Sequence, residues 1–269
     1  MVSNSVIAML VLDLVICFIL PVVIFIFIQK KYKKSLKAFL LGASAFFVSQ
    51  IVLRIPIINN ILPQFTWYIA FQMKYPYLYW IFLGLTAGIF EELGRLILIK
   101  FFMKKNRRFI DSISFGLGHG AIEAMLITGI TYITMLVFAI MINTGTLEAK
   151  LSNLPQAAIN AIYTQCTGLS PLDAIMGGIE RIIAMGIHIG LTVIIFEGVV
   201  KNKATIYFII AVLIHAVIDS SIGFMSQMFG FSIITMEAVF AIMSAALILY
   251  VYKAKRRVNW HEENNIKYN

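Results

Sequence analysis

Three charged residues, Glu91, Glu92 and Arg95, lie within about one turn of an otherwise apolar stretch, AGIFEELGRLILIK (residues 87–100). The stretch has the hydropathy of part of a membrane-spanning helix. A charged side chain at the centre of a bilayer costs about 2.5–3.5 kcal/mol on insertion scales, whereas each surrounding Leu, Ile or Phe contributes only about 0.3–0.6 kcal/mol in favour of insertion. Charges placed at such a cost indicate a functional polar centre inside the membrane.

Three further apolar segments each carry a histidine. SFGLGHGAIEAM contains His119 and Glu123, MGIHIGL contains His188, and IHAVIDSS contains His215 and Asp219. The acid follows the histidine by four residues in the first and third segments, so each pair shares a helix face. Counted at 1.5 Å per residue from the basic end of each segment, the histidines and the first of the two glutamates lie at a common depth of about 15–18 Å. These side chains can therefore converge if their helices are neighbours.

Neutral imidazoles are common metal ligands, and three of them with an open fourth position form one pattern of a catalytic zinc site. His119, His188 and His215 are accordingly the predicted metal ligands. A nearby glutamate can take a proton from water and pass it to a leaving amine. Glu91 is the predicted general base, with Glu92 as the alternative. A glutamate and a histidine could also activate water without a metal, and the residue types alone do not decide between these mechanisms.

The remaining acids and the arginine have supporting roles in this hypothesis. Glu123 and Asp219 are predicted to orient the histidines or to act as additional ligands. Arg95 is predicted to pair with a glutamate, in a structural or a catalytic role. By the same depth count Glu180 and Arg181 lie near the outer interface, where we expect them to pair or to extend towards water.

The composition identifies the broad class that must position these residues. The chain has 269 residues, of which 60% are hydrophobic and 13% charged, with a mean hydropathy of +0.89. A soluble domain of this length could not bury so much apolar surface. The apolar runs are continuous, which excludes a transmembrane barrel. The net charge of +9 comes from Lys and Arg clusters in short loops, so it indicates membrane topology and not nucleic-acid binding.

We predict an all-α integral membrane protein with about seven transmembrane helices, forming a single polytopic domain over residues 1–269. The catalytic core is expected at about residues 77–226 and a polar tail at 253–269. The basic clusters predict an N-terminus outside and a C-terminus in the cytoplasm. The loop 143–170 is then extracytoplasmic and could contain an interfacial helix. The predicted spans cover approximately residues 6–28, 36–55, 77–101, 109–142, 171–200, 204–224 and 231–252.

The segments EELGR, FGLGHGAIEA, GIHIGL and HAVIDSS, in this order on successive helices, resemble the YhfC family of intramembrane metalloproteases. They are more distantly similar to the CAAX-processing and bacteriocin-processing (CPBP) endopeptidases and to PrsW. The first segment is one residue shorter than the CPBP pattern E-E-x-x-x-R and matches the E-E-x-x-K spacing of PrsW. The resemblance covers about residues 91–220. It implies a peptidase that cleaves within or near the membrane.

The predicted function is therefore a zinc-dependent intramembrane endopeptidase in a bacterial plasma membrane. Its partners are the lipid bilayer and a membrane-associated peptide or protein substrate, with no nucleic acid. One alternative is a proton- or ion-coupled transporter, because chains of His and acidic residues also form proton relays. The absence of an inverted repeat and of a Pro-broken helix pair in the sequence disfavours it. A second alternative is a non-catalytic sensor or immunity-type membrane protein with the same fold.

Overall fold

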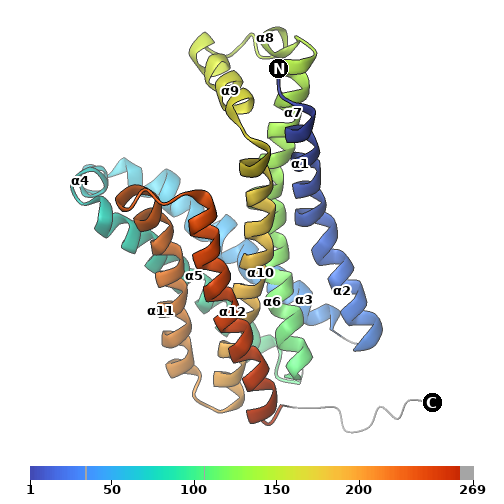
Figure 1. Ribbon diagram of the computed structural model, residues 1–269. Helices are drawn as coiled ribbons and strands as arrows, with labels where there is room; N and C mark the ends of the chain where they lie inside the picture. The colour runs from blue at the N-terminus through green and yellow to red at the C-terminus, as the bar shows by residue number, and fades with distance from the viewer. Residues whose placement is uncertain (34, 106, 261–269) are drawn as a thin grey trace.

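The computed structural model describes residues 1–33, 35–105 and 107–260, which form helices and no strand (Figure 1). The long helices are α1 (Asn4–Leu14), α2 (Leu20–Lys31), α3 (Leu36–Phe46), α5 (Pro76–Phe102), α6 (Phe109–Glu123), α7 (Ile130–Asn143), α10 (Pro171–Val200), α11 (Ala204–Gly223) and α12 (Ile233–Arg257). The shorter ones are α4 (Thr66–Lys74), α8 (Leu147–Lys150), α9 (Gln156–Gly168) and the 3₁₀ turn η4 (Leu62–Gln64). The π-helical segments are η1 (Val15–Ile19), η2 (Phe47–Arg54), η3 (Ile57–Ile61), η5 (Ala124–Gly129) and η6 (Phe224–Met228).

The prediction of a multi-pass helical membrane protein is confirmed. Within the described part of the chain, six helices are long and apolar enough to cross a membrane: Asn4–Lys31, Leu36–Gln64, Phe109–Asn143, Pro171–Val200, Ala204–Met228 and Ile233–Arg257. The remaining predicted span, residues 77–101, corresponds to α5, which is 27 residues long and carries Glu91, Glu92 and Arg95. This helix is long enough to cross a bilayer. It differs from the other six helices because its charged residues lower its hydropathy.

Several boundaries differ from the predicted spans. The second span continues through η2 and η3 to Gln64, beyond the expected end near residue 55. The helix α4, between the second and third spans, was not predicted. The predicted start of the fifth span is confirmed, since the Ser170 side chain accepts a hydrogen bond from the Asp173 backbone N–H at 3.1 Å and Pro171 is the first helical residue. The helix α9 lies in the loop for which an interfacial helix was expected.

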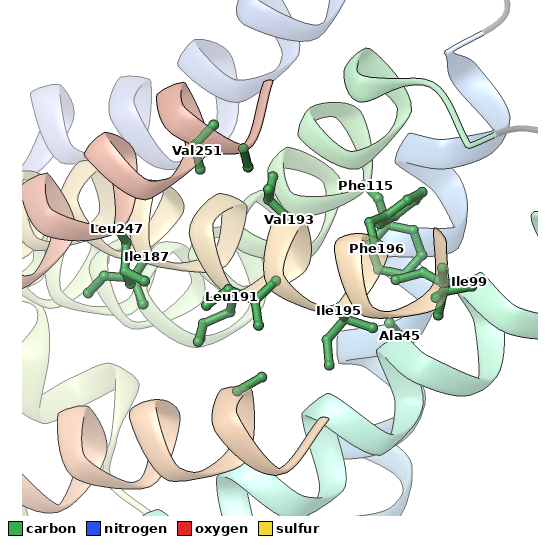
Figure 2. Close-up of a cluster of buried hydrophobic side chains, with 14 of the residues drawn as sticks. Ala45, Ile99, Phe115, Ile187, Leu191, Val193, Ile195, Phe196, Leu247 and Val251 are labelled. Carbon is green, nitrogen blue, oxygen red and sulfur yellow. The ribbon is translucent and has the colours of Figure 1, made fainter. Parts of the chain in front are cut away.

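The long helix α10 forms the centre of the bundle. Its residues Leu191, Ile195 and Phe196 are all at most 1% exposed. Figure 2 shows Phe196 beside Phe115 of α6, with ring centroids 6.0 Å apart in an edge-to-face arrangement. This apolar packing covers the C-terminal part of α10, and His188 lies about one turn before Leu191.

Close backbone approaches bring the polar helices together. A Cβ atom built on Gly88 of α5 would lie 2.8 Å from the Val212 carbonyl oxygen of α11. A Cβ on Gly116 of α6 would lie 2.5 Å from the Ile189 Cα of α10. Both distances are shorter than real Cβ contacts, so these two crossings require glycine. The crossings lie within about one turn of Glu91 and His119, and they place the polar side chains of neighbouring helices within reach of one another.

Four segments rich in Lys and Arg follow the predicted spans 6–28, 77–101, 171–200 and 231–252, and they lie at one end of the bundle, opposite the N-terminus (Figure 1). Arg108 Nη1 donates to the Lys33 carbonyl at 3.1 Å, which joins the first two segments. Lys201 and Arg257 both contact the buried carboxylate of Glu197, at 2.7 and 2.9 Å, which joins the other two. The hydrogen bond to Glu197 raises the pKa of Lys201, which therefore stays charged. This clustering supports our proposal that the basic end faces the cytoplasm.

Topology reporters test this orientation directly. We expect tags inserted after Ile28, after Phe101 and at the C-terminus to report the cytoplasm, because basic loops are retained on that side. A tag near Lys150 should report the opposite side and serves as the internal control. An extracytoplasmic signal from any of the first three tags would contradict the orientation or the number of spans.

Candidate metal centre within the helix bundle

The carboxylate of Glu91 lies among side chains from three other helices. Its Oε2 atom is 2.8 Å from His119 Nε2 of α6, and its Oε1 atom is 3.8 Å from His215 Nε2 of α11. Gln50 of η2 donates a short hydrogen bond to Oε1, and Arg95 lies 3.6 Å from Oε2. Glu91 is 3% exposed, so these contacts replace almost all of its hydration.

Glu92 is completely buried and contacts two of the partners of Glu91, His215 and Arg95, through other nitrogen atoms of these side chains. Its Oε1 atom accepts from His215 Nδ1 at 2.8 Å and from the Arg95 guanidinium. Because the carboxylate only accepts, His215 carries its proton on Nδ1 when the ring is neutral. The lone pair on His215 Nε2 then faces Glu91 and Asp219, whose Oδ2 atom is 3.6 Å away.

The His188 ring is held by an arginine on one side and a carboxylate on the other. Arg95 Nη2 lies 2.7 Å from His188 Nδ1. Since a guanidinium only donates, Nδ1 must be the acceptor, and the ring proton of neutral His188 is on Nε2. Nε2 contacts the Glu123 carboxylate, whose other oxygen accepts from Arg181 at 2.9 Å. Arg181 also pairs with Glu180 and is only 8% exposed, so of the two expected arrangements it pairs with carboxylates and does not extend towards water.

A compact set of possible metal ligands is formed by Glu91, His119 and His188. One ligand atom from each of these residues lies within 4.8 Å of the other two. The His119 and His188 ring centroids are 4.6 Å apart. Two imidazoles and one carboxylate are a donor set of catalytic zinc sites. The sequence analysis expected three histidines as ligands and Glu91 as the base, whereas His215 lies outside this compact set and Glu91 lies within it.

A cavity of about 300 Å³ reaches this cluster. Its polar lining includes Glu91, His188, His215, Glu123 and Asp219, and its apolar lining comes from α5, α10, α11, Ile127 of η5 and Phe240 of α12. The Glu92 and Arg95 side chains are fully buried behind this lining. Of the two adjacent glutamates, Glu91 is the one that a molecule in the cavity can meet.

Two polar residues of this neighbourhood were missed by the sequence analysis. Gln50 contacts Glu91, and Arg54 lines the cavity. Both lie in η2, four residues apart in an apolar span, which is the same signal that identified the pairs of His and acidic residues. A second π-helical segment, η5, begins directly after Glu123. Such segments occur frequently at functional sites.

Comparison with known proteins agrees with the resemblance found in the sequence. A family model described as YhfC intramembrane metalloprotease matches residues 16–260. The chain is 34% identical over 257 residues to the uncharacterized membrane protein YhfC of Bacillus subtilis (strain 168), and the match covers 95% of this chain and 99% of that relative. No solved structure gives a significant match.

Proposed function

Because this chain belongs to the YhfC intramembrane metalloprotease family, we propose that it is a multi-pass membrane peptidase whose metal is held by Glu91, His119 and His188. The observation that carries this proposal is the proximity of three buried ligand atoms, all within 4.8 Å of one another, beside a cavity lined by polar groups. The donor set fits zinc. The bacterial relative supports a plasma-membrane location.

The charge balance of the cluster also fits a divalent cation. With neutral imidazoles, the ionisable groups that line the cavity or pair with its lining comprise more carboxylates than guanidinium groups. The five carboxylates are Glu91, Glu92, Glu123, Glu180 and Asp219, and the three guanidinium groups belong to Arg54, Arg95 and Arg181. A divalent metal would neutralise this excess of two negative charges, of which the Glu180 and Asp219 side chains, 36% and 35% exposed, keep part of their hydration.

When bound, a divalent metal supplies a Lewis acid that polarises a peptide carbonyl and makes water acidic enough to attack near neutral pH. In the proposed reaction His215 accepts the proton that water loses on attack. Its Nε2 lone pair faces the cavity lining, and Glu92 holds the ring through Nδ1 at 2.8 Å. A carboxylate in this position favours the imidazolium form that follows. His215 then delivers the proton to the leaving amine nitrogen.

This assignment exchanges two roles of the sequence-based hypothesis, in which Glu91 is the base and His215 a ligand. We base the exchange on the compact set of possible ligand atoms, which includes Glu91 and does not include His215. This set also places a demand on Arg95. A ring that gives its Nε2 lone pair to a metal carries its proton on Nδ1. If His188 were to hold a metal through Nε2, which here contacts Glu123, Arg95 would have to leave that ring and could keep its contacts with Glu91 and Glu92.

The proposed substrate is a peptide segment embedded in the membrane. The cavity is lined mainly by residues of α5, α10 and α11 within the bundle, so the scissile bond must reach this depth. Helical backbone in a bilayer is already hydrogen-bonded internally. Cleavage should therefore favour a segment that unwinds near the cut, and we expect the catalytic core to lie at about residues 77–226.

Metal content of the purified protein tests the proposal. We expect close to one equivalent of zinc per chain after purification without chelators, measured by elemental analysis. His119→Ala should lose most of it, because only two protein ligands remain. Ser112→Ala on the same helix is the matched control, since its hydroxyl bonds only to the Phe109 carbonyl of its own helix at 2.6 Å. A folded wild-type protein that binds no divalent metal would overturn the proposal.

A further inference from the structure

The second span reaches the proposed metal centre through two residues of η2. Gln50 is 5% exposed and donates from its amide nitrogen to Oε1 of Glu91. Arg54 lies one turn further along and donates from Nη1 to the Gln50 amide oxygen at 3.1 Å. The three side chains form a continuous hydrogen-bonded chain from Arg54 through Gln50 to Glu91.

The direction of this chain is determined by the chemistry at its two ends. The Arg54 guanidinium can only donate and the Glu91 carboxylate can only accept. Gln50 must therefore present its carbonyl oxygen to Arg54 and its NH₂ group to Glu91. An amide is the side chain that meets both demands, because it offers an acceptor and a donor on one planar group.

Arg54 is itself held against the helix that carries Glu91. Its Nε atom donates to Thr86 Oγ1 at 3.1 Å, and its Nη2 atom donates to the Leu83 carbonyl at 2.7 Å. Both acceptors belong to α5. The guanidinium thus has a fixed position relative to Glu91. Its hydrogen bond to the Gln50 amide oxygen fixes the orientation of that amide as well.

The two carboxylate oxygens of Glu91 have separate partners as a result. Gln50 takes Oε1, while Oε2 faces His119 Nε2 at 2.8 Å. A carboxylate held through one oxygen presents the other in a defined direction. Residues that hydrogen-bond to a ligand in this way orient it, and their loss typically reduces metal affinity by about 10–100-fold.

We propose that Gln50, held by Arg54, is a positioning residue that directs Oε2 of Glu91 towards the metal centre. The inference rests on the proposed function, because it assigns Glu91 as a ligand. It adds the second span to the site, so that the functional unit includes η2 as well as α5, α6, α10 and α11. A merely structural Gln50 would contribute to packing and would leave metal affinity unchanged.

The test measures zinc affinity of the detergent-solubilised full-length protein by competition with a chelator of known affinity. Gln50→Leu, which keeps the volume and loses both hydrogen bonds, should bind zinc about 10–100-fold more weakly. Gln50→Glu keeps an acceptor for Arg54 and lacks the donor to Glu91, so it should be weakened at least as much. If the leucine variant does not fold, the Gln50→Glu variant still tests the inference.

The matched control is Ser49→Ala, which alters the neighbouring residue of η2. The Ser49 hydroxyl bonds to the Ala45 carbonyl of its own helix at 2.6 Å, so its removal should leave zinc affinity within about twofold of wild type. A folded Gln50 variant with wild-type zinc affinity would overturn the positioning role while leaving the metal centre intact. Absence of zinc binding by the wild type would instead overturn the metal centre and the positioning role together.

Discussion

Glu91→Gln is expected to release bound zinc and reduce cleavage by more than about 10²-fold, while Glu92→Gln retains zinc. The two residues are adjacent, yet only Glu91 belongs to the compact ligand set. An amide is a poor zinc ligand compared with a carboxylate. Glu92 has no place in that set, and its Oε1 atom accepts from both Arg95 and His215. A glutamine oxygen can accept both bonds, so the Glu92→Gln site should remain assembled.

Cleavage by Glu92→Gln should nevertheless fall by about 10²-fold, because the neutral amide no longer stabilises the charged ring of His215. The measurements are zinc per chain and the cleavage rate of a membrane-anchored reporter peptide, compared for both variants in one preparation. Retention of zinc by an inactive Glu91→Gln would return Glu91 to the role of general base. Full activity in both variants would contradict any catalytic role for this pair.

Arg95→Leu should lower the free energy of unfolding by about 3–5 kcal/mol, the cost of leaving a buried charge without its partner. Arg95 is fully buried and contacts Glu92, Glu91 and His188. Its removal leaves two adjacent carboxylates with no guanidinium on their own helix. Leucine fills part of the space and forms none of the hydrogen bonds. Activity should fall with stability, since the same contacts orient the site.

Denaturation in mixed micelles measures this loss, and two variants serve as references. Arg95→Lys keeps the charge and loses the planar fork, so its stability should lie between those of the wild type and the leucine variant. Arg256→Leu removes an arginine that pairs with Tyr252 on the exposed surface of α12, and it should change stability by less than about 0.5 kcal/mol. Wild-type stability in Arg95→Leu would show that the glutamates do not depend on this partner.

Much of the site could be predicted because charges inside a membrane are rare and must meet one another. Glu91, His119, His188 and His215 stand out in apolar segments, and a common depth follows from counting residues. Depth is uncertain by several ångströms when helix ends are estimated from hydropathy. The side chains of the site are only 2.7–3.8 Å apart, so an error of this size in depth is enough to confuse a metal ligand with the residue beside it. The exchange of roles that we propose for Glu91 and His215 therefore could not be derived from the sequence.

The contribution of the second span was missed for a different reason. Gln50 and Arg54 lie in a π-helical segment, where the residues that face a neighbour differ from those of a regular α-helix. Their orientation towards Glu91 depends on this local geometry and on the close packing of α5. Hydropathy similarly could not extend the second span to Gln64, because its last turns contain Pro56 and two asparagines.

The buried carboxylate of Glu197 attaches the C-terminal end of α12 to the rest of the bundle. Arg257 donates to it from the last residue of α12, together with Lys201 and Tyr250. Beyond that helix, Trp260 is 8% exposed and donates to the Ala254 carbonyl at 3.2 Å. A truncation designed by hydropathy would stop near residue 252 and would remove a cation from a buried anion. Expression and engineering of this protein therefore require that the residues up to Trp260 be retained.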